Sequence, residues 1–458
     1  MSATAGLAEQ KTWEPQPAAE RVVQTALKHV CDALPIASNL RDRLLAEAGV
    51  RLGDLIDTFY VAGDAPLLAA AHAVGWKRAE KAGPWQLWRN AKGVFPQIAS
   101  SAAIATAYVG MDLKVESVAH FLFVHGLHSD ISRDIAGDVD DCFRRACVAR
   151  NESAELAVTE RLGWAGLLEG APGVDVSLRQ RIYESFLLRP RQAVDEAIIF
   201  DAVNDLVDRA IDATNRDVAC ALFFAAERQF WMQRNRAAVL QYNRQQRLGI
   251  GWANHDHHTY RSSRQYFSKL VALWEKLGLI CRERFYAGRE AGWGAQVMEQ
   301  PVTGIVTFND VDLSPDELFG DFSHDGLAPR DRLGTIGLWC GLHGESLTSA
   351  GMHHLEAMFG FDALRDQLTN AGVGVMKPFT DFGYLRQAFT EGERWAVSPT
   401  RIDRLLTLGL ITAEQAETFR AKGALGSHLE NLERNAGFKG FNQTGVSEII
   451  AATDPRKR

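Results

Sequence analysis

The sequence predicts an α+β protein: a mainly helical N-terminal half, followed by a pair of βαβββ-like modules. Between 19 and 247 apolar residues recur at helical spacing, and the segment 217–247 contains neither Gly nor Pro. The pattern changes at the Gly-rich segment 248–251, after which strand-like and helix-like stretches alternate. This alternation occurs twice in a similar order between 249 and 400, which predicts two related modules.

The domain boundaries follow from these changes of pattern. Residues 1–18 are small, polar and Pro-bearing, which is typical of a flexible arm. Residues 19–247 are expected to form the helical domain, packed beside the module pair and narrowing its mouth. Residues 248–400 are expected to form the α/β domain, and 401–458 a helical extension with a polar tail.

Composition excludes several classes of protein. With 46% hydrophobic and 23% charged residues, the 458-residue chain is typical of a globular protein. Its formal charge of −7 is spread without a basic stripe, so we expect no nucleic-acid partner. We also expect no membrane span, no signal peptide and, with six scattered Cys, reduced thiols in a cytoplasmic protein. The helical half is large enough for dimerisation, so a homo-oligomer stays open.

Each predicted module begins with a strand and a helix. In the first, the strand 255–261 precedes a helix whose apolar residues recur from Phe267 to Leu277, and Gly278 ends that helix. Strands are then expected at 279–286, 294–299 and 303–308. In the second module the apolar stretch 333–343 is interpreted as a strand, 349–371 as a helix, and 373–379 and 383–397 as strands.

The densest polar cluster of the chain lies on the first strand. Strand alternation places His255, His257, Thr259 and Arg261 on one face, with His258 and Tyr260 on the other. A neutral imidazole can bind a divalent metal, and a guanidinium on the same face can hold a carboxylate in a fork. The competing interpretation is a surface loop of solvated histidines.

Three further residues complete the predicted site. His343 ends the apolar stretch 333–343 and mirrors His257, with His353 or His354 as substitutes from the following helix. Glu391 and Glu393 share one strand face, where carboxylates are costly unless paired or metal-bound. The alternatives are a solvent-facing His343 and glutamates paired with neighbouring arginines.

Two short segments carry a family resemblance. The segment 256–262, Asp-His-His-Thr-Tyr-Arg-Ser, resembles the Asp-His-x-x-x-Arg-Thr/Ser strand of the 2-oxoadipate dioxygenase/decarboxylase (hydroxyglutarate synthase) family, which has a vicinal-oxygen-chelate-like fold. The segment 389–394, Phe-Thr-Glu-Gly-Glu-Arg, resembles its Phe-Gly-Glu-x-Glu motif. The family's Asn-His-x-Thr motif is missing, and His343 is the substitute chosen for its histidine. The resemblance spans about 150 residues, and residues 1–248 add nothing to it.

The resemblance implies a non-haem Fe(II)-dependent oxygenase that uses O2 to decarboxylate and hydroxylate a small 2-oxo acid. It implies His257, His343 and Glu391 as metal ligands, and Arg261 as the group that binds the substrate carboxylate. Two alternatives stay open. One is a metal-dependent isomerase, hydrolase or lyase with Glu393 or His255 as general base. The other is a ligand-binding protein without catalysis.

Overall fold

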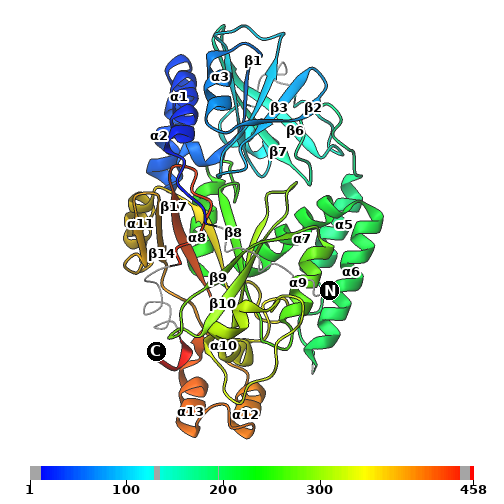
Figure 1. Cartoon of the computed structure of the whole chain (residues 1–458), viewed down its shortest axis with the longest axis vertical. Coiled ribbons are helices and arrows are strands. Elements are labelled where there is room, and N and C mark those ends of the chain that lie inside the picture. Colours follow the sequence, from blue (N-terminus) through cyan, green and yellow to red (C-terminus); the bar gives the residue numbers. More distant parts are fainter. Residues whose placement is uncertain (1–11, 128–134, 194, 444–453, 458) are drawn as a thin grey trace, which may run out of the picture.

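The strands of the protein, seen here in a computed structural model, form two large curled sheets with helices packed around them (Figure 1). The structure describes residues 12–127, 135–193, 195–443 and 454–457. Among these residues no helix has both the length and the apolar character needed to span a membrane.

The eight-stranded sheet is built from two βαβββ modules. The first comprises β8 (His255–Arg261), α9 (Phe267–Lys276), β9 (Ile280–Tyr286), β10 (Trp293–Glu299) and β11 (Val306–Asp312). The second comprises β12 (His354–Met358), α11 (Phe361–Asn370), β13 (Thr380–Phe382), β14 (Leu385–Phe389) and β17 (His428–Arg434).

Both modules have the same strand order. The sheet runs β13-β14-β17-β12-β8-β11-β10-β9, so each module's first strand lies next to its last. These pairs, β8 with β11 and β12 with β17, are parallel, whereas β8 and β12 join the modules in antiparallel fashion. The predicted α+β class and the paired-module architecture of the C-terminal half are therefore confirmed.

The second module begins later than the sequence suggested. The stretch 333–343 is not a strand but contains helix α10 (Thr335–His343), and the module's first strand, β12, lies inside the predicted helix 349–371. Helix α10 is buried nearly all round and so shows no amphipathic period that would reveal it. The carboxylate of Asp312 caps its start, accepting backbone N–H groups of Gly334, Ile336 and Gly337 at 2.9, 3.0 and 2.9 Å.

The module also ends later than residue 400. Its last strand, β17, comes from the expected helical extension. The segment between β14 and β17 forms a small appendage at one end of the molecule (Figure 1). The elements of this appendage are β15 (Arg394–Trp395), α12 (Pro399–Thr407), α13 (Ala413–Lys422) and β16 (Ala424–Leu425).

The N-terminal half is not mainly helical, because it contains the seven-stranded sheet. Its strands are β1 (Ile56–Ala62), β2 (Lys77–Ala82), β3 (Trp85–Arg89), β4 (Gln97–Ser101), β5 (Val109–Lys114), β6 (Phe143–Arg150) and β7 (Ala154–Arg161). Their order, β2-β3-β4-β1-β5-β7-β6, repeats the module pattern: β1 is parallel to β4, β5 is parallel to β7, and β1 and β5 are antiparallel. The second copy has one strand fewer. Strand β1 is buried on both faces, so its apolar residues do not alternate with polar ones. Strand β7 is rich in Ala, Glu and Leu, which have low strand propensity or favour helices, so its sequence does not indicate a strand.

The remaining helices surround and link the two sheets. They are α1 (Pro17–Ala33), α2 (Pro35–Ala48), α3 (Pro66–Ala73), α4 (Val118–Val124), α5 (Val176–Leu187), α6 (Glu196–Ala213), α7 (Arg216–Met232) and α8 (Arg236–Gln246), with short 3-10 turns η1 (Leu52–Leu55), η2 (Pro315–Phe319) and η3 (Pro455–Lys457).

The predicted helix 217–247 is two helices, α7 and α8. The break falls at Asn235, whose side chain accepts the N–H of Ala238 at 2.9 Å and so starts α8. Burial of this segment is confirmed: the ring of Phe224 lies 5.1 Å from His258 and 6.2 Å from Tyr260. Helix α7 thus covers the back of β8, opposite the face that carries His257, rather than narrowing the mouth of the site.

Removal of the Phe224 ring tests this packing. Phe224 is fully buried, so Phe224→Ala should lower the free energy of unfolding by about 3–5 kcal/mol, measured by denaturant titration with tryptophan fluorescence. Phe319 is 72% exposed, so Phe319→Ala is the matched control and should change little. Similar losses in both variants would contradict the assignment of α7 as a core helix.

Candidate metal centre

A cup of polar side chains lies where the two modules meet. Strand β8 contributes His257, β12 contributes His354 and Glu356, and β17 contributes Glu430. Residues two apart on a strand share a face, so these side chains all point into one cavity of about 70 Å3. The cavity's aromatic wall consists of Phe285, Trp293, Phe308, Phe379, Phe389 and Phe441.

The polar atoms in the cup converge. His257 Nε2 lies 2.9 Å from Glu356 Oε1, His354 Nε2 contacts the same oxygen, and His354 Nε2 lies 3.6 Å from Glu430 Oε2. The ligand-type atoms of His257, Glu356 and Glu430 all lie within 4.8 Å of one another. Such a group has the donor types and spacing of a site for a divalent metal.

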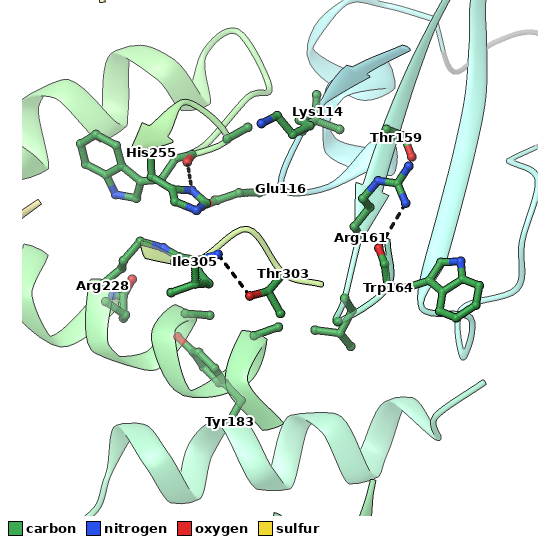
Figure 2. Close-up of a pocket in the computed structure, with 18 of the residues that line it drawn as sticks. Lys114, Glu116, Thr159, Arg161, Trp164, Tyr183, Arg228, His255, Thr303 and Ile305 are labelled. Atoms are coloured by element: carbon green, nitrogen blue, oxygen red, sulfur yellow. Dashed lines mark hydrogen bonds between the residues drawn. The ribbon is translucent and has the colours of Figure 1, made fainter. Parts of the chain in front are cut away.

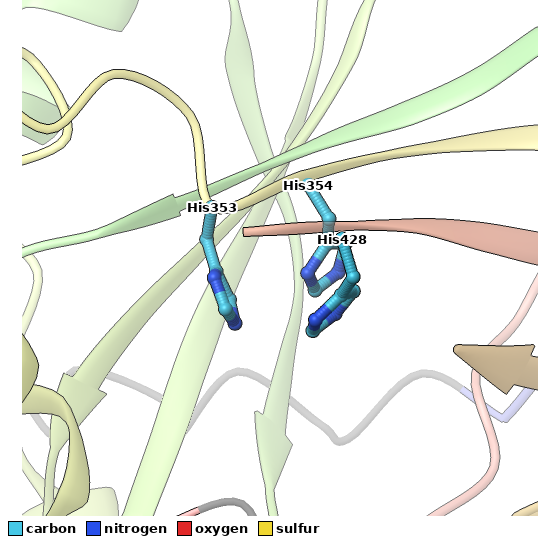
Figure 3. Close-up of side chains that lie close together, drawn as sticks. All are labelled: His353, His354 and His428. Carbon is cyan, nitrogen blue, oxygen red and sulfur yellow. The ribbon is translucent and has the colours of Figure 1, made fainter. Parts of the chain in front are cut away.

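Three histidines stand side by side at one wall of the cup (Figure 3). His353 comes just before β12, and His354 and His428 are the first residues of β12 and β17. The rings of His354 and His428 stack with centroids 4.6 Å apart, and His353 Nδ1 donates to the carbonyl of Gly426 at 3.1 Å. His354 belongs to this group and also contacts the carboxylates, so it connects the two clusters.

The ring of His257 is held in one orientation. Its Nδ1 donates to Asp256 Oδ2 at 2.7 Å, and Arg434 holds the same carboxylate at 2.8 and 2.9 Å. Burial alone would raise the pKa of Asp256, but the charge of Arg434 and the hydrogen bond from His257 lower it. An ionised Asp256 keeps the proton on Nδ1 and presents the Nε2 lone pair to the cup, as in carboxylate–histidine–metal arrangements.

The charges in the cup call for a cation. Burial raises the pKa of Glu430 to about 8 and that of Glu356 well above its usual range, and it lowers the pKa of His257 to about 4. A lone pair of His257 facing a carboxylate oxygen at 2.9 Å is repulsive unless a proton or a cation lies between them. Glu356 Oε2 and His354 Nδ1 are buried without a hydrogen-bond partner among the described residues. A bound divalent ion would relieve this buried charge, so the residues fit a metal.

The module repeat identifies which histidines correspond. The segment Asp256-His257-x-Thr259 on β8 matches His353-His354-x-Glu356 before and along β12, each at the start of its module. In the antiparallel pairing Thr259 lies opposite His354, and His257 opposite Glu356. His257 and His354 are therefore equivalent residues of the two modules, related across the β8–β12 pair.

The last strands of the modules differ at one decisive position. Phe308 of β11 lies opposite Thr259, and Glu430 of β17 lies opposite Glu356, which makes Phe308 and Glu430 equivalent. The cup therefore has a histidine from each module, whereas both of its glutamates, Glu356 and Glu430, come from the second module. The side formed by Phe308 is apolar.

His343 does not reach the cup. It ends helix α10, where its Nε2 donates to the carbonyl of Leu425 at 3.0 Å and its ring packs against Trp339 and Trp395. It belongs to none of the three groups of converging ligand-type side chains among the described residues. His353 and His354, the two residues named as its possible substitutes, both line the cup, and His354 does so from a strand rather than a helix.

The two glutamates predicted at 391 and 393 also lie outside the cup. Glu391 is exposed, accepts the N–H of Gly374 at 3.3 Å and lines a cavity of about 260 Å3 that adjoins the cup. Glu393 Oε1 accepts the backbone N–H of Arg236 at 2.8 Å and so caps the start of α8. The structure brings neither glutamate together with His257.

The carboxylates of the cup had a signal in the sequence. The tripeptide His-Leu-Glu occurs at 354–356 and again at 428–430, and the two copies pair in parallel, residue for residue. A repeated metal-ligand tripeptide at the starts of two short strands could have indicated that Glu356 and Glu430 share a face.

His255 and Arg261 were both placed on the face of His257, and only Arg261 lies there. A register shift in β8 pairs His257 with Glu356 and His255 with Ala357, which turns His255 to the back of the sheet. Arg261 lines the cup, with Nε 3.6 Å from Asp310 Oδ2 and its guanidinium 5.4 Å from the ring centre of Trp339.

Comparisons with known proteins give low similarity. No family model matches the sequence, and no curated protein matches it. A variant of 4-hydroxymandelate synthase from Streptomyces coelicolor is 12% identical with a TM-score of 0.28, covering 88% of this chain and 99% of that one. Methylmalonyl-CoA epimerase from Mycobacterium tuberculosis is 12% identical with a TM-score of 0.23, covering 40% and 88%. A glyoxalase I variant from Zea mays is 14% identical with a TM-score of 0.18, covering 24% and 44%. The function proposed below rests on the side chains of this chain.

Metal content distinguishes the metal ligands that the structure indicates from the metal ligands that were predicted from sequence. His354→Ala and Glu430→Ala should each lose bound divalent metal, because each removes a converging ligand. Glu391→Ala is the matched control and should keep it. Metal-to-protein ratios from inductively coupled plasma mass spectrometry, on protein loaded without oxygen, provide the measurement. If Glu391→Ala loses its metal and Glu430→Ala keeps it fully, the ligand set expected from sequence would be supported and the cup assignment would be wrong.

Proposed function

We propose that this chain is a non-haem Fe(II)-dependent oxygenase that decarboxylates and hydroxylates a small 2-oxo acid. His257, His354 and Glu430 would hold the metal. The observation that carries the proposal is the convergence of two histidines and two glutamates in a buried, aromatic-walled cup, of which Glu430 is assigned as the third ligand. Two histidines and a carboxylate leave neighbouring positions open, which is typical of non-haem Fe(II) oxygenases. When bound, Fe(II) supplies the sites at which a 2-oxo acid and O2 react.

Arg261 is the residue that we assign to the substrate carboxylate. It lies on the same face of β8 as His257, four residues along the chain, and is 5% exposed. Burial lowers its pKa, although Asp310 opposes this, and burial raises the pKa of Asp310 to about 7. The Arg261 Nε is buried without a hydrogen-bond partner among the described residues. A substrate carboxylate would give this guanidinium the fork contact that Asp310, at 3.6 Å, does not provide.

The wall of the cup limits the substrate and excludes water. A cavity of about 70 Å3 holds only a few non-hydrogen atoms before side chains move, which favours a small acid. Phe308 and Phe441 flank His257, with ring centroids 5.9 and 4.9 Å from the imidazole. Apolar surroundings of this kind strengthen charge interactions between the site and a bound acid.

Glu356 favours a second candidate function. It is a fourth ligand-type residue, buried, and within hydrogen-bond distance of His257 and Thr259. As a base beside the metal, its carboxylate could take a proton from carbon next to a carbonyl, which is the chemistry of a metal-dependent isomerase or lyase. Thr259 donates to Glu356 Oε1 at 2.9 Å and would orient that oxygen.

Oxygen uptake separates the two functions. Protein loaded with Fe(II) without oxygen should consume O2 and release CO2 in equal amounts when supplied with a suitable member of a panel of 2-oxo acids. Glu356→Gln should keep part of this activity, because the proposed ligands remain. Conversion of a panel member without O2 uptake, abolished in Glu356→Gln, would instead establish the isomerase or lyase.

The assignment of Arg261 has its own test. Arg261→Lys keeps the charge but loses the planar fork, so KM for the 2-oxo acid should rise by roughly tenfold or more, about 1.4 kcal/mol or more in binding. Metal content should stay unchanged. Arg264→Lys, which alters an arginine bound to Glu317 outside the cup, is the control. Loss of metal in Arg261→Lys with an unchanged KM would show that Arg261 has a structural role.

A further inference from the structure

A second cavity lies on the back of β8, away from the metal cup. It has a volume of about 360 Å3, and both halves of the chain line it. Figure 2 shows Lys114, Thr159 and Arg161 facing it from the N-terminal sheet, with Arg228 facing it from α7 and His255 from β8. The proposed oxygenase chemistry makes no use of this cavity.

Arg228 is the central cation of this cavity. Its Nη1 donates to His258 Nε2 at 3.1 Å, and His258 Nδ1 donates to the carbonyl of Val306 at 3.2 Å, which fixes Nε2 as the acceptor. Among the described residues no carboxylate lies within ion-pair distance of Arg228. Burial lowers the pKa of Arg228, although Glu116 opposes this. Arg228 is partly buried, and desolvation of a guanidinium without a carboxylate partner is costly unless an anion reaches it.

The other charges at the cavity leave an excess of positive charge. Arg161 is satisfied, because Asp57 accepts from its Nε and Nη2 at 2.9 and 2.7 Å. Lys114 has no ion-pair partner among the described residues. Glu116 is the one carboxylate among the described lining residues, and its Oε2 accepts the hydroxyl of Tyr242 at 3.0 Å.

The rest of the wall is apolar and aromatic. Trp164, Tyr183, Trp252, Met232 and Ile305 line it, and the volume lies in the range of pockets for small organic ligands. A cavity lined by both cations and aromatic rings suits a ligand with an acidic group and an apolar body.

We propose that this cavity is a second binding site, for a small organic anion whose carboxylate or phosphate contacts Arg228 and Lys114. The guanidinium offers paired N–H donors to an oxyanion, and the ammonium adds a second positive charge. The aromatic wall covers the apolar body. The site stands independently of the metal and of the reaction in the cup.

Calorimetric titration of the metal-free, full-length protein tests the proposal. Benzoate and phenyl phosphate are the probes, and they distinguish a carboxylate from a phosphate ligand. We expect saturable 1:1 binding of at least one probe, weakened at least tenfold in Arg228→Met and also reduced in Lys114→Met. Arg181→Met, which removes an exposed cation on α5, is the matched control and should bind as the unchanged protein does.

Three outcomes would overturn the proposal. The first is that neither probe binds saturably. The second is equal affinity in Arg228→Met and Arg181→Met. The third is that binding is lost in Arg261→Met but kept in Arg228→Met, which would place the probe in the cup. If Arg228→Met does not fold, Arg228→Lys and Lys114→Met decide: wild-type affinity in both overturns the site, and reduced affinity in either supports it.

Discussion

The antiparallel pairing of β8 with β12 is the constraint on which the site depends. It places Thr259 opposite His354 and His257 opposite Glu356, and so brings the first strands of two separate modules into one row of side chains. A slip of one residue would turn every one of these side chains to the other face of the sheet. The parallel pairing of β12 with β17 then adds Glu430 beside Glu356. Two hydrogen-bond ladders therefore fix five polar residues on three strands that are distant in the chain.

Such a row of buried ionisable groups is unfavourable for folding by itself. Two carboxylates that are 1% and 2% exposed cannot both keep a charge without a compensating cation, which is why burial raises the pKa of each. The sheet can tolerate the row because the surrounding contacts are strong. Arg434 holds Asp256, Gln387 donates to Glu430 at 2.9 Å, and the aromatic wall packs around them. The cost of burying these carboxylates and the affinity of the cup for a cation have the same physical origin.

The sequence predicted the first module better than the second, for identifiable reasons. The strand at 255–261 and the helix after it carry clear periods of two and 3.6, and His257 and Arg261 were correctly placed on one face. Helix α10 has no polar side to reveal its period, so it was taken for a strand, and β12 was displaced into a helix. His343 then took the place of His354. Glu430 lies beyond an inserted appendage of two helices, where hydrophobic periodicity gives no link to the cup, and the repeated His-Leu-Glu that could have indicated it was not used. The N-terminal strands were missed because most of their residues are buried and several are good helix formers.

The register shift near Asp256 makes β8 a shared wall for both cavities. Without it, strict alternation would place His255 beside His257 in the cup and would turn Asp256 away from Nδ1 of His257. With it, Asp256 bends beside His257 and is held by Arg434, while His255 turns to the back, 5.3 Å from the ring of His258. The neighbouring residues His257 and His258 therefore point to opposite faces of β8. His257 contacts the carboxylate of Glu356, and His258 accepts a hydrogen bond from the guanidinium of Arg228. Helix α7 carries Arg228 and packs its Phe224 against the same strand. Strand β8 alone therefore separates the two cavities, and neighbouring residues of this strand face one cavity or the other.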